Sequence, residues 1–308
     1  MTAAEARPLC ADVSAQSDEP MAATASRVEH WLLIEYGGYW PYEPLDAAVF
    51  AGRLREHLAA QLASLRYARL LLVKRPGRGR EDRVRVIYGA TPEHGRRFYT
   101  LELDGHPDLL DLDVASALRG DGPPPGEPLD HPLLLVCTHG IRDRCCARYG
   151  HALSREVHRS VDPEWLWQST HVGGDRFAGN LVVLPEGLYF GRVGRTDVAP
   201  LLAAYLAGRI ELRFYRGRSC YPFPVQAAES HVRAATGLIG FHDLRLLGAR
   251  KTAPDAWRVE LLAELAGLVH ELEVGVVLGE PSFLTCKAET PKPPRHFVVR
   301  SHRERASA

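Results

Sequence analysis

The stretch that decides the fold runs from Leu133 to Val193 and reads LLLVCTHGIRDRCCARYGHALSREVHRSVDPEWLWQSTHVGGDRFAGNLVVLPEGLYFGRV. Its apolar runs at 133–137 and 165–170 are typical of buried strands, and the residues between them repeat with helical spacing. The first run ends at Cys137, and the second leads into His171. Because ligands collect at the ends of strands in α/β sheets, we expect a single metal or cluster site here. Its candidate ligands are Cys137, Cys146, His171 and Asp175.

Two motifs in this stretch resemble the sucrase/ferredoxin-like family, whose members are relatives of thioredoxin-like [2Fe–2S] ferredoxins. One reads Cys137-Thr-His-Gly-x-Arg-Asp-x-x-Cys146, and the other reads Thr-His171-x-Gly-Gly-x-Arg-Phe-Ala-Gly-Asn. Matching flanks, among them Trp31-Leu-Leu-Ile-Glu, extend the resemblance over most of residues 10 to 230. The resemblance implies a thioredoxin-like central domain with two cysteine and two histidine ligands, in the order Cys-x8-Cys and His-x3-His.

One position departs from the ligand pattern that the resemblance implies. The carried-over ligands are Cys137, Cys146 and His171, and Asp175 stands where the second histidine would be. Three interpretations of the site compete: Asp175 ligates directly, Cys145 or His139 supplies the fourth ligand instead, or the site has lost its cluster. A purely structural Asp175, paired with Arg176 or a neighbouring arginine, is a further alternative. We expect direct ligation by Asp175, although a carboxylate is a harder ligand than imidazole.

A [2Fe–2S] cluster needs four ligands, and thiolates suit it because the softness of sulfur matches that of the cluster. Imidazoles replace two of the thiolates in Rieske centres. Gly173 and Gly174 lack a Cβ, so the backbone can approach the cluster and an N–H can donate to a bridging sulfide. His139 is expected to orient the Cys137 loop or to donate to the cluster. These three residues are therefore candidate cofactor-binding residues.

The composition is that of an ordinary soluble protein: 308 residues, 45% hydrophobic and 25% charged, with a formal net charge of zero. No overall field attracts nucleic acid or a membrane. The resemblance to ferredoxins implies an electron carrier, whose expected partner is an unidentified redox protein. No signal peptide is recognisable, and no apolar run approaches the ~20 residues that span a bilayer. Half of the six cysteines fall within ten positions, which favours metal chemistry in a reducing compartment, and we expect a cytoplasmic protein.

The pattern of elements predicts an α/β (α+β overall) protein with three regions. Residues 1–125 form an N-terminal α/β lobe after a flexible lead over residues 1–25, and this lobe is either a degenerate thioredoxin-like copy or a simple scaffold. Residues 126–217 form a thioredoxin-like ferredoxin domain in the order strand, helix, strand, hairpin, helix. Residues 218–308 form a small α+β appendage. Its expected strands lie at 243–250, 257–263, 274–278, 283–288 and 297–300.

These observations favour an electron-transfer protein that carries one [2Fe–2S] cluster, rather than an enzyme. The alternatives are a thiol oxidoreductase that uses Cys145 or Cys146, a zinc site in place of the cluster, and a cluster-free interaction module. The first strand–helix junction lacks a Cys-x-x-Cys motif, which weighs against the oxidoreductase. No stretch indicates the paired carboxylates of a glycosidase. Colour discriminates these classes, because a [2Fe–2S] protein is red-brown whereas zinc and thiol proteins are colourless.

Overall fold

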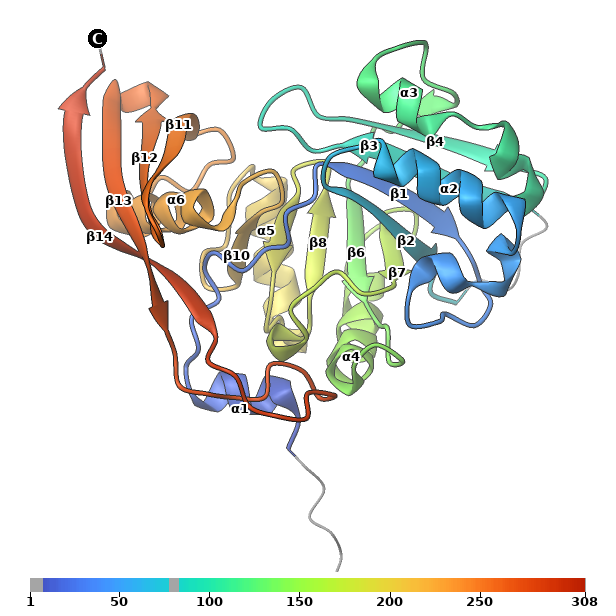
Figure 1. Ribbon diagram of the computed structural model, residues 1–308, viewed down its shortest axis with the longest axis horizontal. Helices are drawn as coiled ribbons and strands as arrows, with labels where there is room; N and C mark the ends of the chain where they lie inside the picture. The colour runs from blue at the N-terminus through green and yellow to red at the C-terminus, as the bar shows by residue number, and fades with distance from the viewer. Residues whose placement is uncertain (1–7, 78–82, 308) are drawn as a thin grey trace, which may run out of the picture.

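The computed structural model describes residues 8–77 and 83–307, in which two sheets are flanked by helices (Figure 1). The larger sheet consists of β1 (His30–Glu35), β2 (Ala68–Lys74), β3 (Val84–Ala90), β4 (Arg97–Leu103), β5 (Glu127–Pro128), β6 (Leu133–Cys137), β7 (Leu166–Ser169), β8 (Leu181–Leu184), β9 (Leu188–Phe190) and β10 (Tyr215–Arg218). The smaller sheet consists of β11 (Leu244–Ala253), β12 (Ala256–Ala263), β13 (Leu268–Leu278) and β14 (Arg295–Ala306). The helices are α1 (Cys10–Gln16), α2 (Arg53–Ala63), α3 (Val114–Arg119), α4 (Arg144–Ser160), α5 (Val198–Leu206) and α6 (Phe223–Thr236).

The larger sheet repeats one arrangement twice, and its strand order is β10-β9-β8-β6-β7-β2-β1-β3-β4-β5. In the central half, β6 is parallel to β7 across the crossover helix α4, and the antiparallel hairpin β8–β9 follows on the other side of β6. In the N-terminal half, β1 is parallel to β2 across α2, and the hairpin β3–β4 follows on the other side of β1. Strand, helix, strand, hairpin and helix is the thioredoxin-like order. The N-terminal lobe therefore repeats that order, which agrees with the degenerate copy that the sequence offered as the alternative to a simple scaffold.

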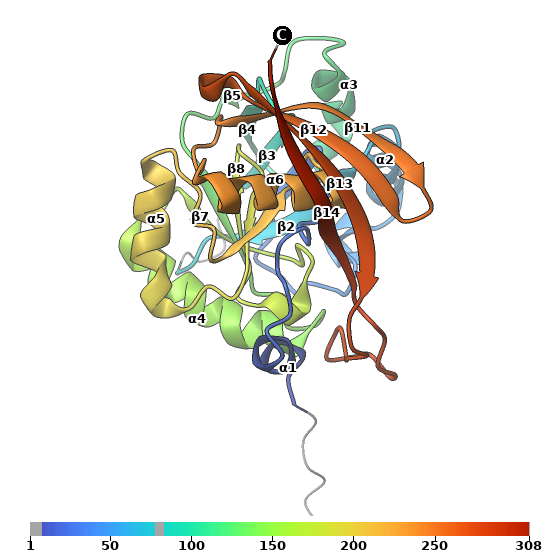
Figure 2. The same ribbon diagram turned by 90° about the vertical axis from the view of Figure 1, so that its left-hand side faces the viewer.

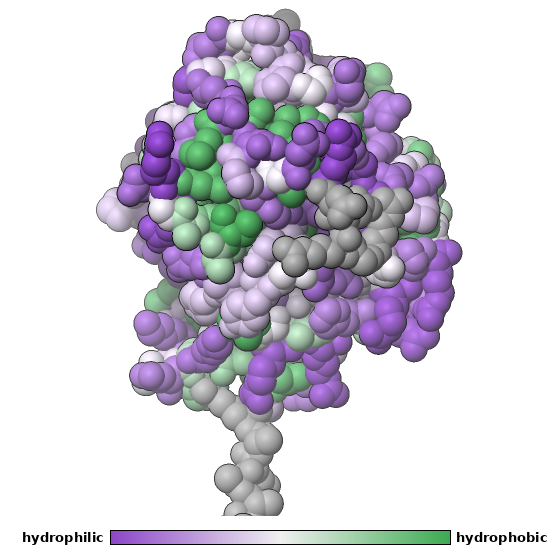
Figure 3. Space-filling model, turned by 90° about the vertical axis from the view of Figure 1, so that its right-hand side faces the viewer, coloured by the Kyte–Doolittle hydropathy of each residue, from purple (hydrophilic) through white to green (hydrophobic). Residues whose placement is uncertain are grey.

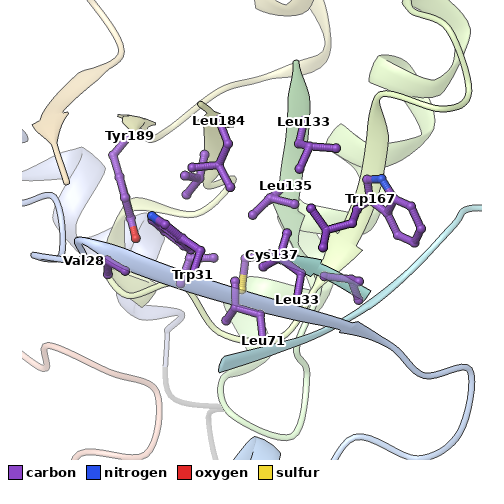
Figure 4. Close-up of a cluster of buried hydrophobic side chains, with 14 of the residues drawn as sticks. Val28, Trp31, Leu33, Leu71, Leu133, Leu135, Cys137, Trp167, Leu184 and Tyr189 are labelled. Atoms are coloured by element: carbon purple, nitrogen blue, oxygen red, sulfur yellow. The ribbon is translucent and has the colours of Figure 1, made fainter. Parts of the chain in front are cut away.

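The two halves share one core. Strand β2 pairs antiparallel with β7, so the halves join through their second strands. Trp31 and Leu33 of β1 pack in the same buried cluster as Leu135 of β6 and Trp167 of β7 (Figure 4). Neighbouring residues of β6 alternate, and Leu134 instead packs in a second cluster with residues of α4 and α5. The central strands are thus buried on both faces, which holds their ends rigidly.

The C-terminal region is an α+β unit, as expected. Its four strands are antiparallel in the order β11-β12-β13-β14, and α6 lies against this sheet (Figures 1 and 2). Val225 and Val232 of α6 share a buried cluster with Val259 and Leu272. None of the helices in the described part of the chain is long and apolar enough to cross a membrane. The face shown in Figure 3 is mainly hydrophilic, and its most extended apolar area lies at the upper left.

Three segments differ from the sequence expectations. Part of the supposed flexible lead forms α1, which buries Cys10, Ala11 and Ser14. Residues 283–288 form no strand, and the pairing there is one bridge between Ser282 and Lys292. Pro281 and Pro291 stand next to the two bridge residues and cannot donate hydrogen bonds that would extend the ladder. The short strand expected at 297–300 is part of the longer β14. The sequence did not predict the rest of β14, because the strand is mostly exposed and rich in charged residues. It is a strand because it pairs along the whole of β13.

Candidate metal centre

The first two candidate ligands come from the junction of β6 and α4. Strand β6 is buried along its whole length, as in a central strand covered on both faces, and it ends at Cys137. The N–H of Cys137 donates to the carbonyl of Asn180 at 3.2 Å, which fixes this strand end. Asp143 then caps α4, because its Oδ1 accepts a hydrogen bond from the N–H of Cys145 at 2.8 Å. Cys146 follows in the first turn of the helix and is buried.

A glycine allows α4 to lie close enough to β6. A Cβ added to Gly150 would lie 1.9 Å from the carbonyl oxygen of Cys137, which is far inside van der Waals contact. Any larger residue at position 150 would push the helix away from the strand. Gly150 therefore keeps Cys146 of the helix near Cys137 of the strand.

The other two candidate ligands follow β7. Because β7 is parallel to β6 and Cys137 is in register with Ser169, the two strands deliver their ligands at the same end. The Nδ1 atom of His171 lies 3.9 Å from Sγ of Cys137 and 3.7 Å from Sγ of Cys146. The Oδ1 atom of Asp175 lies 3.1 Å from the same Nδ1 and 3.5 Å from Sγ of Cys146. The structure thus brings Cys137, Cys146 and His171 within 4.8 Å of one another, and Asp175 adjoins the latter two.

The two alternative fourth ligands lie outside this group. The thiol of Cys145 contacts two other cysteine sulfurs, at 3.5 and 3.4 Å. His139 is buried, its ring packs edge-on against Trp40 with the ring centroids 6.1 Å apart, and neither of its ring nitrogens hydrogen-bonds to another described residue. It does not belong to the close group of Cys137, Cys146 and His171. Of the three candidates for the fourth position, Asp175 is the one that lies beside the other ligands.

The two predicted cofactor-binding glycines have a demonstrable packing role. Gly173 and Gly174 have φ angles of +99° and +82°, which L-residues rarely adopt. A Cβ on Gly173 would lie 2.2 Å from Oγ of Ser26, and one on Gly174 would lie 2.2 Å from Nη2 of Arg216. Close packing inside the protein therefore requires both glycines, and their contact with a cofactor stays a prediction.

Arg216 is a residue of the site that no motif indicated. Its side chain is 1% exposed, and its Nη1 donates to the carbonyl of Gly173 at 3.0 Å and to Oδ1 of Asn180 at 2.8 Å. Its Nη2 donates to the carbonyl of Thr24 at 2.6 Å. Burial lowers the pKa of Arg216 to about 10, so the guanidinium remains charged at neutral pH. This buried cation ties the N-terminal segment to the loop that carries His171 and Asp175.

The four ligand candidates strongly affect one another's ionisation. The hydrogen bond from Cys146, helped by the contact with His171, lowers the pKa of Cys137 well below its usual value. The same hydrogen bond, together with burial, raises the pKa of Cys146. Burial alone would lower the pKa of His171, but Cys137 and Asp175 outweigh it and raise that pKa. Burial raises the pKa of Asp175 although His171 opposes the change. A metal bound by both sulfurs must therefore displace a proton from Cys146.

One side of the group opens to a surface cavity. His171 and His139 line a cavity of about 470 Å³, together with Tyr42 and Arg142. The side chain of His171 is 17% exposed, whereas Cys137 and Cys146 are each 1% exposed. The guanidinium of Arg142 lies over the Tyr42 ring, 4.1 Å from its centroid. The His171 imidazole is thus the most solvent-exposed of the ligand candidates.

Known proteins resemble part of this chain. Two curated relatives are both called altered inheritance of mitochondria protein 32. The one from Meyerozyma guilliermondii is 36% identical over 95 residues, which are 28% of this chain and 34% of the relative. The one from Clavispora lusitaniae is 30% identical over 100 residues, which are 30% of this chain and 37% of the relative. The chain thus matches little more than a third of the length of either relative.

Two solved structures of a thioredoxin-like [2Fe–2S] ferredoxin from Aquifex aeolicus are similar at 18% identity. One covers 30% of this chain and 97% of that chain with a TM-score of 0.27. The other, a variant with one cysteine replaced by serine, covers 29% and 100% with a TM-score of 0.26. The sequence profile of the sucrase/ferredoxin-like family matches residues 21–217. Since this match includes both cysteine and histidine motifs and well over half of the chain, the protein belongs to the sucrase/ferredoxin-like family.

Proposed function

We propose that the protein is an electron carrier that holds one [2Fe–2S] cluster between the β6–α4 junction and the loop after β7. The single observation that carries this proposal is the convergence of Cys137, Cys146, His171 and Asp175. Such a cluster, when bound, would supply one-electron transfer. The donor set fits it chemically, since two thiolates suit one iron and imidazole and carboxylate suit the other.

The residues of the site have separate tasks in this proposal. Cys137 is already disposed to be a thiolate, and Cys146 becomes one when it gives up its proton, so the two sulfurs provide the buried side of the site. His171 and Asp175 provide the side nearer the surface. Arg216 holds the carbonyl of Gly173 and so orients their loop. This division puts the most reactive sulfur chemistry away from solvent.

Electrons would enter and leave through the cavity beside His171. An electron carrier needs a short path from its redox centre to its partner, and the partly exposed imidazole supplies one here. Tyr42 and Arg142 lie on the cavity wall, where a redox partner protein of complementary shape would dock. We assign the protein to a reducing compartment such as the cytoplasm, because thiolate ligands must stay reduced to bind the cluster.

Metal and sulfide analysis tests the proposal. Protein purified without oxygen should be red-brown and contain about two irons and two acid-labile sulfides per chain. Reduction with dithionite should bleach the colour, and reoxidation should restore it. Stoichiometric zinc at these residues with no sulfide would overturn the electron-carrier proposal.

A single zinc ion at the same residues is the second candidate. The observation that favours it is the compactness of the group: the Nδ1 of His171 lies within 3.9 Å of both sulfurs and of the Asp175 carboxylate. The ligand atoms of Cys137, Cys146 and His171 all lie within 4.8 Å of one another, which suits one tetrahedral ion with the adjoining Asp175 as its fourth ligand. A two-iron core needs more room between its two pairs of ligands. The cavity next to His171 offers such room. A colourless protein whose zinc disappears in Cys137→Ser would establish this candidate instead.

A further inference from the structure

Three cysteines that the candidate metal centre does not use meet at a second place in the fold. Cys10 belongs to α1, Cys145 to the first turn of α4, and Cys286 to the segment between β13 and β14. The Sγ atom of Cys145 lies 3.5 Å from that of Cys10 and 3.4 Å from that of Cys286, and the remaining pair is 3.7 Å apart. Figure 1 shows how the segment after β13 runs down to α1 below the sheet. The three thiols thus form a nearly equilateral triangle.

A buried carboxylate adjoins this triangle. Asp143 is 0% exposed, and both of its oxygens lie 3.9 Å from the sulfur of Cys10. Its Oδ1 accepts from the N–H of Cys145 at 2.8 Å and its Oδ2 from the N–H of Cys286 at 2.7 Å. A carboxylate oxygen and the three sulfurs all lie within 4.8 Å of one another.

We propose that these four residues bind one Zn²⁺ ion in a structural site distinct from the candidate metal centre. The spacing of the sulfurs supports this: tetrahedral zinc with Zn–S bonds of about 2.3 Å places its sulfur ligands about 3.8 Å apart. The observed separations of 3.4–3.7 Å need to grow only slightly. The donor set of three thiolates and one carboxylate suits zinc, which binds both kinds of ligand.

The buried negative charge of Asp143 also favours a bound cation. A buried carboxylate is costly unless a positive charge or several hydrogen bonds compensate for it. Within residues 8–77 and 83–307, no Lys, Arg or His forms an ion pair with Asp143, and two backbone N–H groups are its strong partners. A third N–H, that of Ala11, donates to the sulfur of Cys145 at 3.5 Å, and hydrogen bonds of this kind orient and stabilise the ligands of metal sites.

A disulfide is a weaker explanation of the same geometry. It would join two of the three sulfurs, leave the third thiol unused, and need an oxidant. It would also leave the Asp143 carboxylate buried without a cation. Zinc uses all four groups at once, and the half-buried Cys286 gives the ion a way in from the surface.

Zinc at this site would fasten α1 and the segment between β13 and β14 to α4, the helix that carries Cys146. The three cysteines are separated along the chain by 135, 141 and 276 residues. Since such a site does not exist in the unfolded chain, zinc binding stabilises the docked arrangement of α1 and the β13–β14 segment. Cys145 directly precedes Cys146, so the ion would also hold the first turn of α4 in place.

Metal analysis of the full-length, untagged protein tests this proposal. Zinc-supplemented wild-type protein should contain about one zinc per chain at this site, whatever the candidate metal centre contains. Cys10→Ser and Cys286→Ser should each lower the zinc content at least severalfold and lower the melting temperature. Cys220→Ser is the matched control, because this thiol lies outside both cysteine groups, and it should keep its zinc. Cys137→Ser should also keep this zinc, even though it empties the candidate metal centre.

Three results would overturn the proposal. The first is a folded wild-type protein with less than about a tenth of a zinc per chain. The second is a zinc content that Cys137→Ser lowers and Cys10→Ser does not. The third is a disulfide among the three cysteines, found by mass spectrometry without reduction. If the serine variants do not fold, thiol alkylation of the wild-type protein decides the matter. Cys10, Cys145 and Cys286 should be protected from alkylation with zinc and become reactive after chelation, and equal reactivity in both states would contradict zinc binding.

Discussion

The Oδ1 atom of Asp175 lies 3.1 Å from the Nδ1 atom of His171, so a carboxylate and an imidazole face the buried sulfurs as a pair. The same oxygen lies 3.5 Å from Sγ of Cys146. Asp175 therefore adjoins two of the other ligand candidates, although it departs from the His-x3-His pattern. Its negative charge distinguishes this site from one with two neutral imidazoles, and that difference leads to the most specific prediction, argued last.

The two adjacent cysteines should differ in their effects on metal content, because they belong to different groups. Cys146→Ser should abolish the iron and sulfide of the protein, as Cys137→Ser should. Cys145→Ser should leave most of the iron and sulfide but remove the zinc of the second site. Iron, sulfide and zinc analysis of the same three samples checks this. Loss of the red-brown colour in Cys145→Ser alone would mean that the ligand assignment is wrong.

Replacement of Gly150 should destabilise the protein although alanine is the better helix former. Gly→Ala in a helix normally stabilises by about 0.5–1 kcal/mol. Here the new Cβ would meet the Cys137 carbonyl, 1.9 Å away in the present backbone, so α4 must shift. We expect a net loss of about 1–3 kcal/mol in the free energy of unfolding. Denaturant unfolding measures it, with the exposed Arg155→Ala in the same helix as control, expected within about 0.5 kcal/mol of wild type. A stabilised Gly150→Ala protein would contradict the close contact.

The buried Arg216 should affect both stability and reduction potential, and two substitutions separate these effects. Arg216→Met removes the hydrogen bonds to Gly173 and Asn180 and also the positive charge, so both the melting temperature and the potential should fall. Arg216→Lys keeps a charge but not the planar fork, so stability should fall while the potential changes less. The exposed Arg213→Met serves as control. Equal potentials in Arg216→Met and wild type would show that the charge of Arg216 does not reach the redox centre.

The sequence was sufficient for the central domain because each of its elements carries a local signal. Strand β6 is an unbroken apolar run, α4 begins at an acidic cap, and β7 repeats the pattern of β6 before His171. The parallel crossover then places the ends of both strands together. The prediction that residues 126–217 form a domain of their own stays a prediction, and the core that Trp31 shares with Leu135 crosses its boundary.

What the sequence did not reveal depends on contacts between distant segments. Arg216 stands in no motif, and its role arises only because β10 returns to the edge of the sheet beside β9. Cys10, Cys145 and Cys286 lie too far apart in the chain for any spacing to join them. The polar and exposed strand β14 lacks the alternation of apolar residues by which strands are recognised in a sequence. Its pairing with β13 makes it a strand.

The identity of residue 175 should set the reduction potential of the cluster. An oxidised [2Fe–2S] core carries two positive charges, which two thiolates cancel. The Asp175 carboxylate then makes the site negative, and adding an electron to a negative site of low dielectric is harder. Centres with two histidines reach roughly −150 to +300 mV, against about −400 mV for plant-type ferredoxins. Asp175→His, which restores the His-x3-His spacing, should therefore raise the potential measured by redox titration. Asp175→Ala should weaken or empty the cluster.

The pH dependence of the same variants gives an independent check. A ligand imidazole can lose its outer proton at high pH, which adds negative charge and lowers the potential, whereas a ligand carboxylate has no such proton to lose. The potential of Asp175→His should therefore fall more steeply with rising pH than that of the wild-type protein, where His171 alone can respond. Asp111→Asn, which removes an exposed carboxylate of the N-terminal half, should change neither the potential nor its slope. If Asp175→Ala keeps the wild-type spectrum and potential, Asp175 is not a ligand, and the search for the fourth ligand passes to His139, since the sulfur of Cys145 belongs to the other group.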